Sequence, residues 1–409
     1  MTVEAAYKEA LRCNKCGFCQ SVCPVYRVSG RESRVARGHN AHLRALVEGT
    51  LRMDEPLLGA AADCLLCRNC VTNCFPAVKT DEIVLEIRRS FRPESALERF
   101  VFRGLLPNPN RFASYLRVLY GASGLGSLAR KLGILPWLGR ALAKATEMGE
   151  PAPHRFLRDS LHKIAPPAEP VGKIHYFVSC GFNFAVPETG VQNLRLLSRL
   201  GFEVNVLPNC CCGLPAFAHG DFAAARSLAL KNAPLLEGTV IVDCASCYSF
   251  LLDYGKHFGI ELRARILDIS EFVAECADGR LDSLFAPGGE SGPLLPVTYH
   301  EPCHFARYHR PASEPRTLLG KIPGVEFREM KEADWCCGAA GFYSVAHARE
   351  SDEILARKIR NVRATGARTL VTACPACILQ LSYGVRKAGL DVRVMHVAEF
   401  ALHRATGMR

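Results

Sequence analysis

From residue 171 onward, short apolar runs alternate with segments in which apolar residues recur every three or four positions. The short runs predict strands, and the longer periodic segments predict helices. Examples are a strand over Lys173–Ser179, a helix around Asn193–Leu200 and a strand over Glu203–Leu207. This alternation is typical of α/β domains.

The first 95 residues have a different pattern, which is mostly helical and dense in cysteine. Helices are expected at Glu4–Leu11 and Thr80–Ser90. Residues 96–170 contain no cysteine, are rich in Arg, Leu, Gly and Pro, and end in the linker-like stretch Ala165–Pro170. We therefore expect an α+β multidomain chain, in which a helical region (1–95) and an insert or linker (96–170) precede the α/β part.

The α/β part contains a repeat that is marked by its cysteines. A single cysteine, a Cys-Cys-Gly triplet and a C-x2-C pair occur twice in the same order, with offsets of 123, 125 and 130 residues between equivalent positions. Near-equal offsets at three positions indicate a duplicated domain, which we divide into a first copy (171–290) and a second copy (291–409). The first copy contains Cys180, Cys211, Cys212, Cys244 and Cys247, and the second contains Cys303, Cys336, Cys337, Cys374 and Cys377.

The chain has 20 cysteines in 409 residues, which is too many for an ordinary cytosolic enzyme. Disulfide scaffolds are usually short and secreted, and the sequence does not open with the basic and apolar segments of a signal peptide. Thiolates committed to metal in a reducing cytoplasm explain the cysteines better. No apolar run reaches the roughly 18–20 residues that span a bilayer. We expect a cytoplasmic protein and leave open a peripheral place on the inner face of the cell membrane.

Two runs near the N-terminus share the spacing C-x2-C-x2-C-x3-C, which is that of bacterial ferredoxins with two [4Fe–4S] clusters. In such proteins three close thiolates hold one cluster and the fourth reaches the other. The alternative, a pair of zinc knuckles, needs only four ligands for each ion and fits two identical runs less well. Proline follows the first run directly, whereas Phe75 separates the second run from Pro76. We assign Cys13, Cys16, Cys19 and Cys74 to one cluster and Cys64, Cys67, Cys70 and Cys23 to the other.

Each copy of the duplicated domain offers five thiols that can converge on one metal centre. Cys180, Cys244 and Cys374 follow predicted strands and stand where helices begin, and a helix N-terminus favours the anionic form of a thiol. Ligands of α/β domains also bind at the carboxyl ends of strands. The first interpretation is a further iron–sulfur centre in each copy. A four-coordinate zinc or an empty thiol cluster stays open, because no spacing rule here is as strict as that of ferredoxins.

The order of these motifs resembles the CCG-domain family of iron–sulfur subunits. That family includes subunits of glycolate oxidase, lactate oxidation complexes and anaerobic glycerol-3-phosphate dehydrogenase, and the catalytic subunit of heterodisulfide reductase. The resemblance covers the whole chain, and its N-terminal helices resemble the α-helical ferredoxin module. The stretches Tyr299–His304 and Cys336–Ser344 look most like the glycolate oxidase subunit. This implies a subunit that takes electrons from a flavoprotein oxidising a 2-hydroxy acid, of the glycolate or lactate type, and passes them toward a quinone or another carrier.

The complete C-x2-C pairs of both copies are more similar to heterodisulfide reductase, in which five cysteines hold noncubane [4Fe–4S] clusters that cleave a disulfide. The resemblance therefore implies an alternative, a catalytic subunit that reduces a disulfide at the duplicated domain. A third alternative is a scaffold whose duplicated domain binds zinc. The sequence shows no G-x-G-x-x-G motif and no P-loop. This supports a separate flavin-bearing partner, because iron–sulfur centres carry electrons and do not usually accept hydride.

Several residues beside the motifs do not distinguish between the proposed functions. Cys210 precedes the first Cys-Cys pair and is interpreted as a bystander thiol, and Cys276 as part of the core. His300, His304 and Arg307 flank Cys303, and they either serve a metal centre or an anion or are ordinary packed polar residues.

The formal net charge is +11, and residues 99–146 contain eight Lys or Arg and no acidic residue. With the apolar stretch Leu132–Leu138, this segment suits an anionic membrane, a partner subunit or a helix pair packed on the protein's own core. Nucleic acid is disfavoured as a partner, because the aromatic residues are not interleaved with the basic ones as stacking platforms.

Overall fold

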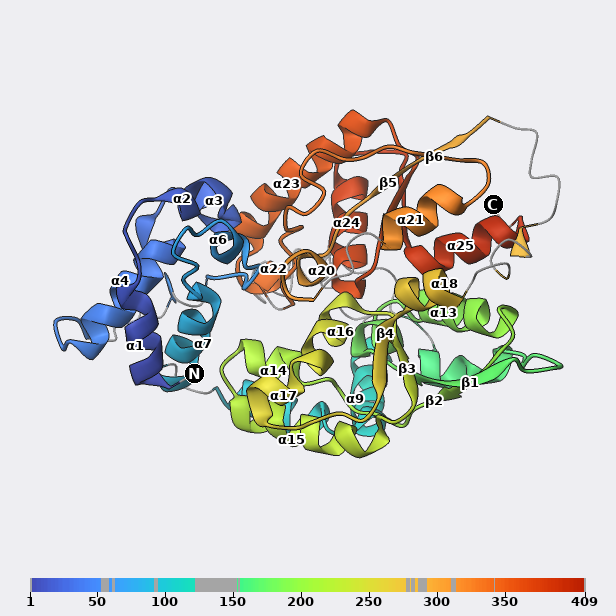
Figure 1. Ribbon diagram of the computed structural model, residues 1–409, viewed down its shortest axis with the longest axis horizontal. Helices are drawn as coiled ribbons and strands as arrows, with labels where there is room; N and C mark the ends of the chain where they lie inside the picture. Colours follow the sequence, from blue (N-terminus) through green and yellow to red (C-terminus); the bar gives the residue numbers. More distant parts are fainter. Residues whose placement is uncertain are drawn as a thin grey trace.

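The computed structural model describes residues 2–52, 59–60, 63–91, 95–121, 153, 155–276, 280, 284–285, 293–309, 314–341 and 343–407. Figure 1 shows three groups of elements: the N-terminal helices at one end, and the two copies of the duplicated domain beside them. The N-terminal elements are α1 (Val3–Leu11), α2 (Phe18–Val22), α3 (Pro24–Ser29), η1 (Glu32–Arg34), α4 (Ala36–Val47), α6 (Asn69–Thr72) and α7 (Thr80–Phe91).

Three of these helices, α1, α4 and α7, pack against one another around a small apolar cluster. Ala6 and Ala10 of α1, and Ile83 and Ile87 of α7, lie four residues apart and are buried, as expected for one face of a helix. The side chain of Thr2 caps α1 by accepting a hydrogen bond from the N–H of Ala5. The helices expected near both ends of this region are therefore confirmed.

Each copy of the duplicated domain contains a four-stranded sheet in which every pair of neighbouring strands is parallel. The strand orders are β2-β1-β3-β4 and β6-β5-β7-β8, so the two sheets have the same topology. The expected mixed α/β architecture and its duplication are confirmed. The strands are β1 (Gly172–Phe177), β2 (Phe202–Val206), β3 (Thr239–Val242), β4 (Arg265–Asp268), β5 (Leu295–Tyr299), β6 (Val325–Phe327), β7 (Thr369–Thr372) and β8 (Arg393–His396).

The inner strands β3 and β7 are almost entirely buried, as expected when helices cover both faces of a sheet. The helices of the first copy are α12 (Cys180–Phe184), α13 (Pro187–Arg199), α14 (Leu214–Ala218), α15 (Phe222–Asn232), η4 (Ala233–Leu235), α16 (Ala245–Leu252), α17 (Tyr254–Phe258) and α18 (Ile269–Cys276). Those of the second copy are α20 (Cys303–Arg307), α21 (Glu314–Lys321), α22 (Tyr343–Ala346), α23 (Ala348–Thr365), α24 (Pro375–Lys387) and α25 (Val397–Thr406).

The two copies pack together through equivalent pairs of helices. Helix α13 contacts α25, and α18 contacts α21, which are the same two helices of the repeat with the copies exchanged. The hydroxyl of Thr189 on α13 donates a hydrogen bond of 3.2 Å to the Glu399 carboxylate on α25. The copies are thus related by an approximate two-fold axis, which brings equivalent loops face to face.

The described part of the 96–170 segment packs on the first copy. It contains α8 (Ala96–Arg99), the π-helix η2 (Phe100–Leu105), α9 (Pro109–Gly121) and the 3₁₀ helix η3 (Leu157–Lys163). Leu106 and Leu157 belong to the core of the first copy, and the N–H of Cys211 donates to the carbonyl of Leu106. This supports packing on the protein's own core for that part. The apolar stretch Leu132–Leu138 lies outside the described residues.

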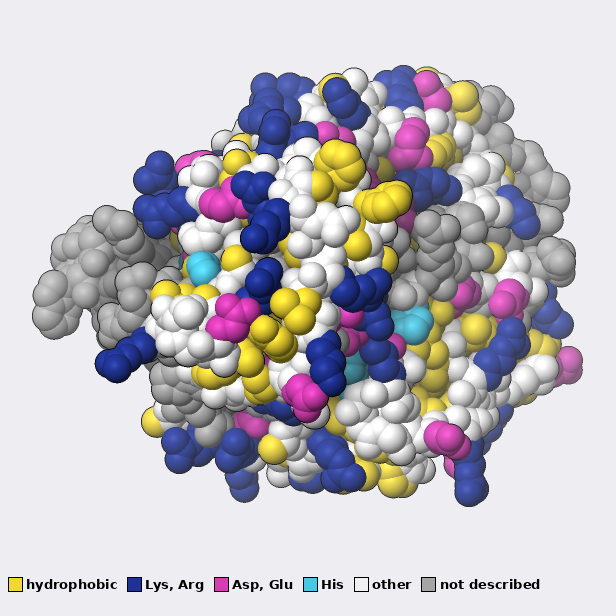
Figure 2. Space-filling model, turned by 60° about the vertical axis from the view of Figure 1, so that its left-hand side comes forward, with side chains coloured by type: hydrophobic (Ala, Val, Ile, Leu, Met, Phe, Trp, Pro, Cys, Tyr) yellow, Lys and Arg dark blue, Asp and Glu magenta, His cyan; other side chains and the backbone are white. Residues whose placement is uncertain are grey.

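Within the described part of the chain, no helix combines the length and the apolar character needed to cross a bilayer. The excess of positive charge is not gathered in one place on the face shown in Figure 2, where Lys and Arg side chains are dispersed and interspersed with acidic ones. The net charge therefore does not by itself mark a binding surface on this face.

Candidate iron–sulfur sites

The two N-terminal cysteine runs form loops with the same unusual backbone. Lys15 and Gly17 in the first loop, and Leu66 and Arg68 in the second, have φ values between 54° and 86°. Each pair stands at the same two positions relative to the cysteines. Left-handed backbone is costly for residues other than glycine, and it persists where the surroundings require it. A loop that wraps its thiols around a central group explains the repeated conformation.

The thiols assigned to the first cluster lie on one side of the helical region. Burial, together with the nearby thiols of Cys13 and Cys16, raises the pKa of Cys19. Cys13 and Cys74 pack against the same apolar cluster of α1, α4 and α7, although they are 61 residues apart in the sequence. Cys16 is exposed, so this set lies close to solvent.

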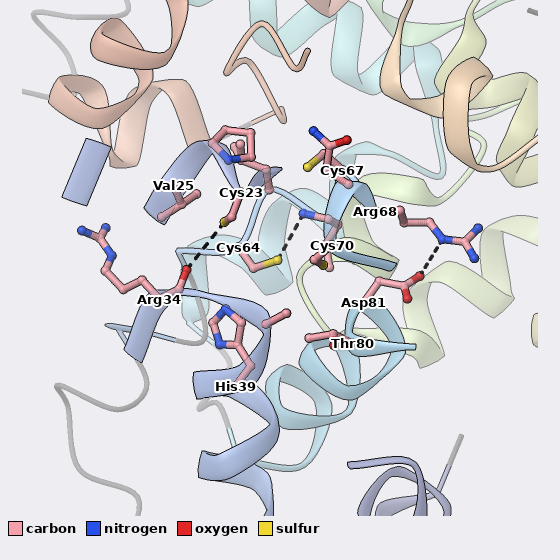
Figure 3. Close-up of a pocket in the computed structure, with 15 residues that line it drawn as sticks. Cys23, Val25, Arg34, His39, Cys64, Cys67, Arg68, Cys70, Thr80 and Asp81 are labelled. Carbon is pink, nitrogen blue, oxygen red and sulfur yellow. Dashed lines mark hydrogen bonds and ion pairs between the residues drawn. The ribbon is translucent and has the colours of Figure 1, made fainter. Parts of the chain in front are cut away.

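The thiols assigned to the second cluster line one pocket, of about 440 Å³ including its open side. Figure 3 shows Cys23, Cys64, Cys67 and Cys70 around this space, with His39 on α4 and Asp81 on α7 forming its wall. Burial raises the pKa of all four thiols, that of Cys23 to about 12. Burial therefore favours the protonated form of these four thiols, and a metal that binds them must displace their protons.

This pocket adjoins the second copy of the duplicated domain. Cys67 belongs to the same apolar cluster as Cys336, with Cys303 packed against it. Burial raises the pKa of Cys67, and the neighbouring Cys336 raises it further. The hydroxyl of Tyr308, at the end of α20, donates a 2.5 Å hydrogen bond to the carbonyl of Leu66 in the ferredoxin-type loop. The structure therefore places a thiol of the N-terminal region beside two thiols of the second copy.

A buried ion-pair network fixes this contact. Arg34 pairs with Asp63 and, at 3.2 Å, with Glu350 at the start of α23. His347 lies 2.8 Å from the other oxygen of Asp63. Arg34 and Asp63 are both buried, and their partners His347 and Glu350 lie more than 280 residues further along the sequence, so the network joins the N-terminal region to the second copy.

All five thiols of the second copy are neighbours. Hydrogen bonds from Cys303 and Cys337 lower the pKa of Cys336 well below its usual range. The Sγ atoms of Cys337 and Cys377 lie 3.6 Å apart, close to the roughly 3.8 Å expected for two thiolates on one tetrahedral ion with bonds of about 2.3 Å. Hydrogen bonds from Cys244 and Cys377 lower the pKa of Cys374. Thiols with a depressed pKa are the form that binds metal.

The five thiols of the first copy repeat this arrangement. Cys180 hydrogen bonds to Cys211, and hydrogen bonds from Cys211 and Cys247 lower the pKa of Cys212 to about 5. Cys247 also forms a hydrogen bond with Cys244, and Cys244 forms a further hydrogen bond with Cys374 of the second copy. Cys244 and Cys374 are equivalent residues of the repeat. The approximate two-fold axis therefore brings the two sets of thiols into direct contact.

The glycine of each Cys-Cys-Gly triplet has a defined structural role. Gly213 and Gly338 have φ values of +100° and +87°, and their N–H groups donate to the sulfur of Cys211 and Cys336 at 3.5 and 3.4 Å. A Cβ at Gly213 would approach the Ala225 oxygen of α15 to 3.1 Å, and a Cβ at Gly338 would approach the Ser351 oxygen of α23 to the same distance. Glycine is therefore needed to turn this amide toward the first sulfur of the pair, where it stabilises the thiolate.

The other residues that flank the motifs have different fates. Cys210 is buried and its Sγ lies 3.3 Å from the Asn232 side chain, apart from the series of thiols. Arg307 bonds to the carbonyl and carboxylate of Asp334. His300 lies within reach of Cys337 and Cys377, which bears on the metal-centre role considered for it from its place beside Cys303. The side chain of Cys276 lies outside the described residues.

The donor set fits iron–sulfur groups. The described cysteines are all free thiols, and soft thiolates favour iron–sulfur clusters and zinc. Three family models match the chain: "4Fe-4S dicluster domain" over residues 9–77, "Glycolate oxidase iron-sulfur subunit, linker region" over 93–148, and "Cysteine-rich domain" twice, over 174–252 and 297–382. Fold and site together define an iron–sulfur protein with a ferredoxin-type region and a duplicated cysteine-rich domain.

Known relatives narrow this class. A probable glycolate oxidase iron–sulfur subunit of Bacillus subtilis is 30% identical over 97% of this chain and 94% of its own length. A component of the dihydromethanophenazine:CoB–CoM heterodisulfide reductase of Methanosarcina acetivorans is 25% identical over 94% of this chain and 91% of its own length. Lactate utilization protein A of Oceanobacillus iheyensis is 27% identical over 99% of its own length, but covers only 58% of this chain. The chain belongs to the glycolate oxidase iron–sulfur subunit family.

Proposed function

We propose that this chain is the electron-transfer subunit of an oxidoreductase complex, and that it passes electrons from a flavoprotein that oxidises a 2-hydroxy acid toward a quinone or another carrier. One observation carries the proposal. Cys67 of the N-terminal region lies beside Cys303 and Cys336 of the second copy, and Cys374 lies beside Cys244 of the first copy. Neighbouring thiols therefore connect the ferredoxin-type region to the second copy, and the second copy to the first.

Four groups of cysteines would hold the redox centres. Iron–sulfur clusters bound there supply one-electron transfer, with potentials set by hydrogen bonds, charge and exposure. The family models and the curated relatives support iron–sulfur binding, and two cubane clusters in the N-terminal region and one centre in each copy are part of the proposal. The groups are Cys13, Cys16, Cys19 and Cys74; Cys23, Cys64, Cys67 and Cys70; Cys303, Cys336, Cys337, Cys374 and Cys377; and Cys180, Cys211, Cys212, Cys244 and Cys247.

The residues around the junction between the N-terminal region and the second copy keep water away from it. Val25, Leu65, Tyr343 and Ile354 are buried and pack around Cys67 and Cys336. A dry junction preserves the electrostatic effect of neighbouring groups on each centre, and the Arg34 network holds its two sides together. Buried apolar side chains thus surround the contact between two of the thiol groups.

The exposed end of the series suits a partner subunit. Leu11, Phe18 and Phe75 are exposed, Phe75 by 87%, and each lies within two residues of Cys13, Cys19 or Cys74. The side-chain amide of Asn73 donates to the carbonyl of Phe18 at 2.9 Å, which joins the two loops. Large exposed aromatic side chains are typical of interface centres. We assign the docking of the flavoprotein subunit to these three residues.

Iron content tests the centres. Anaerobically purified chain should contain about sixteen irons if four four-iron centres are present, and about eight if only the N-terminal region is loaded. A value near sixteen supports the complete series. A value near eight would restrict the function to a ferredoxin-type relay, and a value near zero would overturn the proposal.

Docking is tested with the flavoprotein of the complex. Phe75→Ser should reduce the rate at which the substrate-reduced flavoprotein reduces this chain at least tenfold, without changing iron content, because a central aromatic contact is worth about 2 kcal/mol. Val118→Ser is the matched control, since Val118 is also exposed but lies on α9. Equal rates for both variants would show that Phe75 is not part of the interface with the flavoprotein. Glycolate and lactate, supplied in turn, identify the substrate of the complex.

A quinone acceptor would place the chain at the membrane surface. Flotation of the intact chain with anionic vesicles tests this location. Recovery with the vesicles supports peripheral binding, and recovery only in the dense fraction contradicts it.

Disulfide reduction is a second candidate function, favoured by the complete five-thiol set in each copy. A small pocket beside Cys180 and Cys211, lined by Leu106, Phe112 and Arg158, also gives access to the first copy. This function predicts that the chain alone, supplied with a chemical reductant, cleaves a mixed disulfide. Activity that requires the flavoprotein and a quinone, with no disulfide turnover, would exclude it.

A further inference from the structure

The second copy contains a buried histidine at its thiol set. His300 follows β5 and is fully buried. One of its ring nitrogens and the Sγ atoms of Cys337 and Cys377 all lie within 4.8 Å of one another. This grouping of one imidazole and two thiols is close enough for a single metal ion, given bonds of about 2.0–2.1 Å to nitrogen and about 2.3 Å to sulfur.

The hydrogen bonding of His300 also points to a missing partner. Nδ1 and Nε2 are both buried, and among the described residues neither makes a hydrogen bond of good geometry, although the backbone of Ala333 lies near the ring. The backbone N–H of His300 donates to the carbonyl of Val371 at 2.9 Å, so the main chain is satisfied and holds the residue in place. A buried polar atom left without a partner destabilises the folded state, and the imidazole nitrogen is the commonest metal ligand among protein side chains.

The first copy provides an internal comparison. Cys180 is equivalent to Cys303, so the residue three positions earlier, Phe177, is equivalent to His300. Phe177 is also fully buried, which shows that the repeat accommodates an apolar ring here. The imidazole of the second copy is therefore not needed for packing of the repeat.

We propose that a ring nitrogen of His300 binds the metal centre held by Cys303, Cys336, Cys337, Cys374 and Cys377. The inference rests on the proposed function, because it requires a centre in the second copy. It makes the two centres chemically different: the first copy offers thiolates alone, and the second offers thiolates and one imidazole. Nitrogen ligation raises the potential of an iron–sulfur centre relative to thiolate ligation, so the two centres should have different potentials.

A crystal structure of the anaerobically purified full chain, with anomalous maps at the iron and zinc edges, tests the ligand directly. A metal among the five thiols with a His300 nitrogen about 2.0–2.1 Å away supports the inference. Metal in that position with both nitrogens beyond about 3 Å, too far for a metal–nitrogen bond, overturns it and leaves the proposed function intact. The absence of metal from the second copy, with iron at the N-terminal cysteines, overturns both the inference and the proposed centre of that copy.

Two variants give a second readout. His300→Phe introduces the residue of the first copy, and it should release metal from the second copy to a chelator at least about tenfold faster. His403→Phe is the matched control, because His403 is also buried in the second copy with an unpartnered Nδ1 but has Arg393 as its charged neighbour. Equal release rates for His300→Phe and the wild type would contradict ligation. A misfolded His300→Phe protein leaves the crystallographic test in force.

Discussion

The two copies of the duplicated domain have one architecture but different surroundings. Both have a four-stranded parallel sheet of the same order, the same five thiols and a left-handed glycine behind the Cys-Cys pair. Within the described residues, the second copy contacts the ferredoxin-type loops through Cys303 and Cys336, whereas the first copy contacts α7 through Ala218 and Lys256. The duplication therefore produced two sites of equal geometry and unequal position, one next to the N-terminal region and one at the far end.

The residues around the thiols differ accordingly. The glycine of each triplet faces Ala225 in the first copy and Ser351 in the second, and this register makes Asn232 equivalent to Lys358. Both are fully buried behind the Cys-Cys pair, but only Lys358 brings an ammonium group, which donates to the carbonyl of Ala333 at 3.0 Å. The two copies therefore share a fold but differ in the charge behind the Cys-Cys pair.

The largest effect is expected from breaking the thiol series at equivalent positions. Cys336→Ser and Cys211→Ser should each lose about four irons per chain, because each removes a ligand from one copy. Only Cys336→Ser should also change the midpoint potential of the centre at Cys67, since Cys336 is its neighbour. Anaerobic iron analysis and redox titrations measure both quantities. Identical potentials in the two variants would contradict the different positions of the copies.

The next effect concerns the contacts of the N-terminal region with each copy. Arg34→Met should lower the free energy of opening at the second copy by about 3 kcal/mol, because it leaves Asp63 and Glu350 without their buried guanidinium. Lys256→Met removes a half-exposed pair with Glu82 at the first copy and should cost less than about 1 kcal/mol. Hydrogen exchange of α3 and α23 measures the difference. Similar protection in both variants would show that the buried network does not dominate.

A pH-dependent effect is expected in the first copy. Burial raises the pKa of Asp268 to about 8, whereas its equivalent in the second copy is His396, whose pKa is lowered by burial to about 4. The folded state then binds the Asp268 proton between about pH 4 and 8 while the unfolded state releases it, so this contribution to stability is present at low pH and is lost as the pH rises toward 8.

Asp268→Asn should therefore flatten the loss of stability between about pH 5 and 8 by up to about 1.4 kcal/mol per pH unit. Urea unfolding under anaerobic conditions measures the slope, and Glu261→Gln, at an exposed acid of the same copy, should leave it unchanged. A slope identical to that of the wild type in Asp268→Asn would show that this carboxyl group is charged when folded.

The smallest effect is the charge difference between the copies. Lys358→Asn introduces the residue of the first copy and should lower the reduction potential of the second-copy centre, because a nearby cation stabilises the reduced, more negative state. The free energy of one-electron reduction should become less favourable by about 1–2 kcal/mol. Redox titration measures the shift. Lys387→Asn removes an exposed ammonium paired with Asp352 and should have no effect. An unchanged reduction potential in Lys358→Asn would show that this buried charge does not cause a difference between the two copies.

Much of the site was predictable because its signals are local. The spacing of Cys13 to Cys19 and of Cys64 to Cys70 places three thiols on one loop, and the repeat of Cys-Cys-Gly marks the duplication. The positions of Cys180, Cys244 and Cys374 at helix starts follow from the strand pattern and are confirmed. The reach of His300 to Cys337 and Cys377 was not predictable, since it depends on how β5 packs beside two other loops.

The sequence by itself determined where the cysteines stand and that they fall into repeated sets, because residue type and spacing are properties of short segments. Only the tertiary structure decided the order of those sites. The contact between Cys244 and Cys374 follows from the packing of α13 on α25 and of α18 on α21, and that between Cys67 and Cys336 from the packing of α3 on α23. Burial of apolar surface between distant segments produces both contacts. Because the hydrophobic effect is non-directional, the sequence pattern alone does not say which distant segments will pack together.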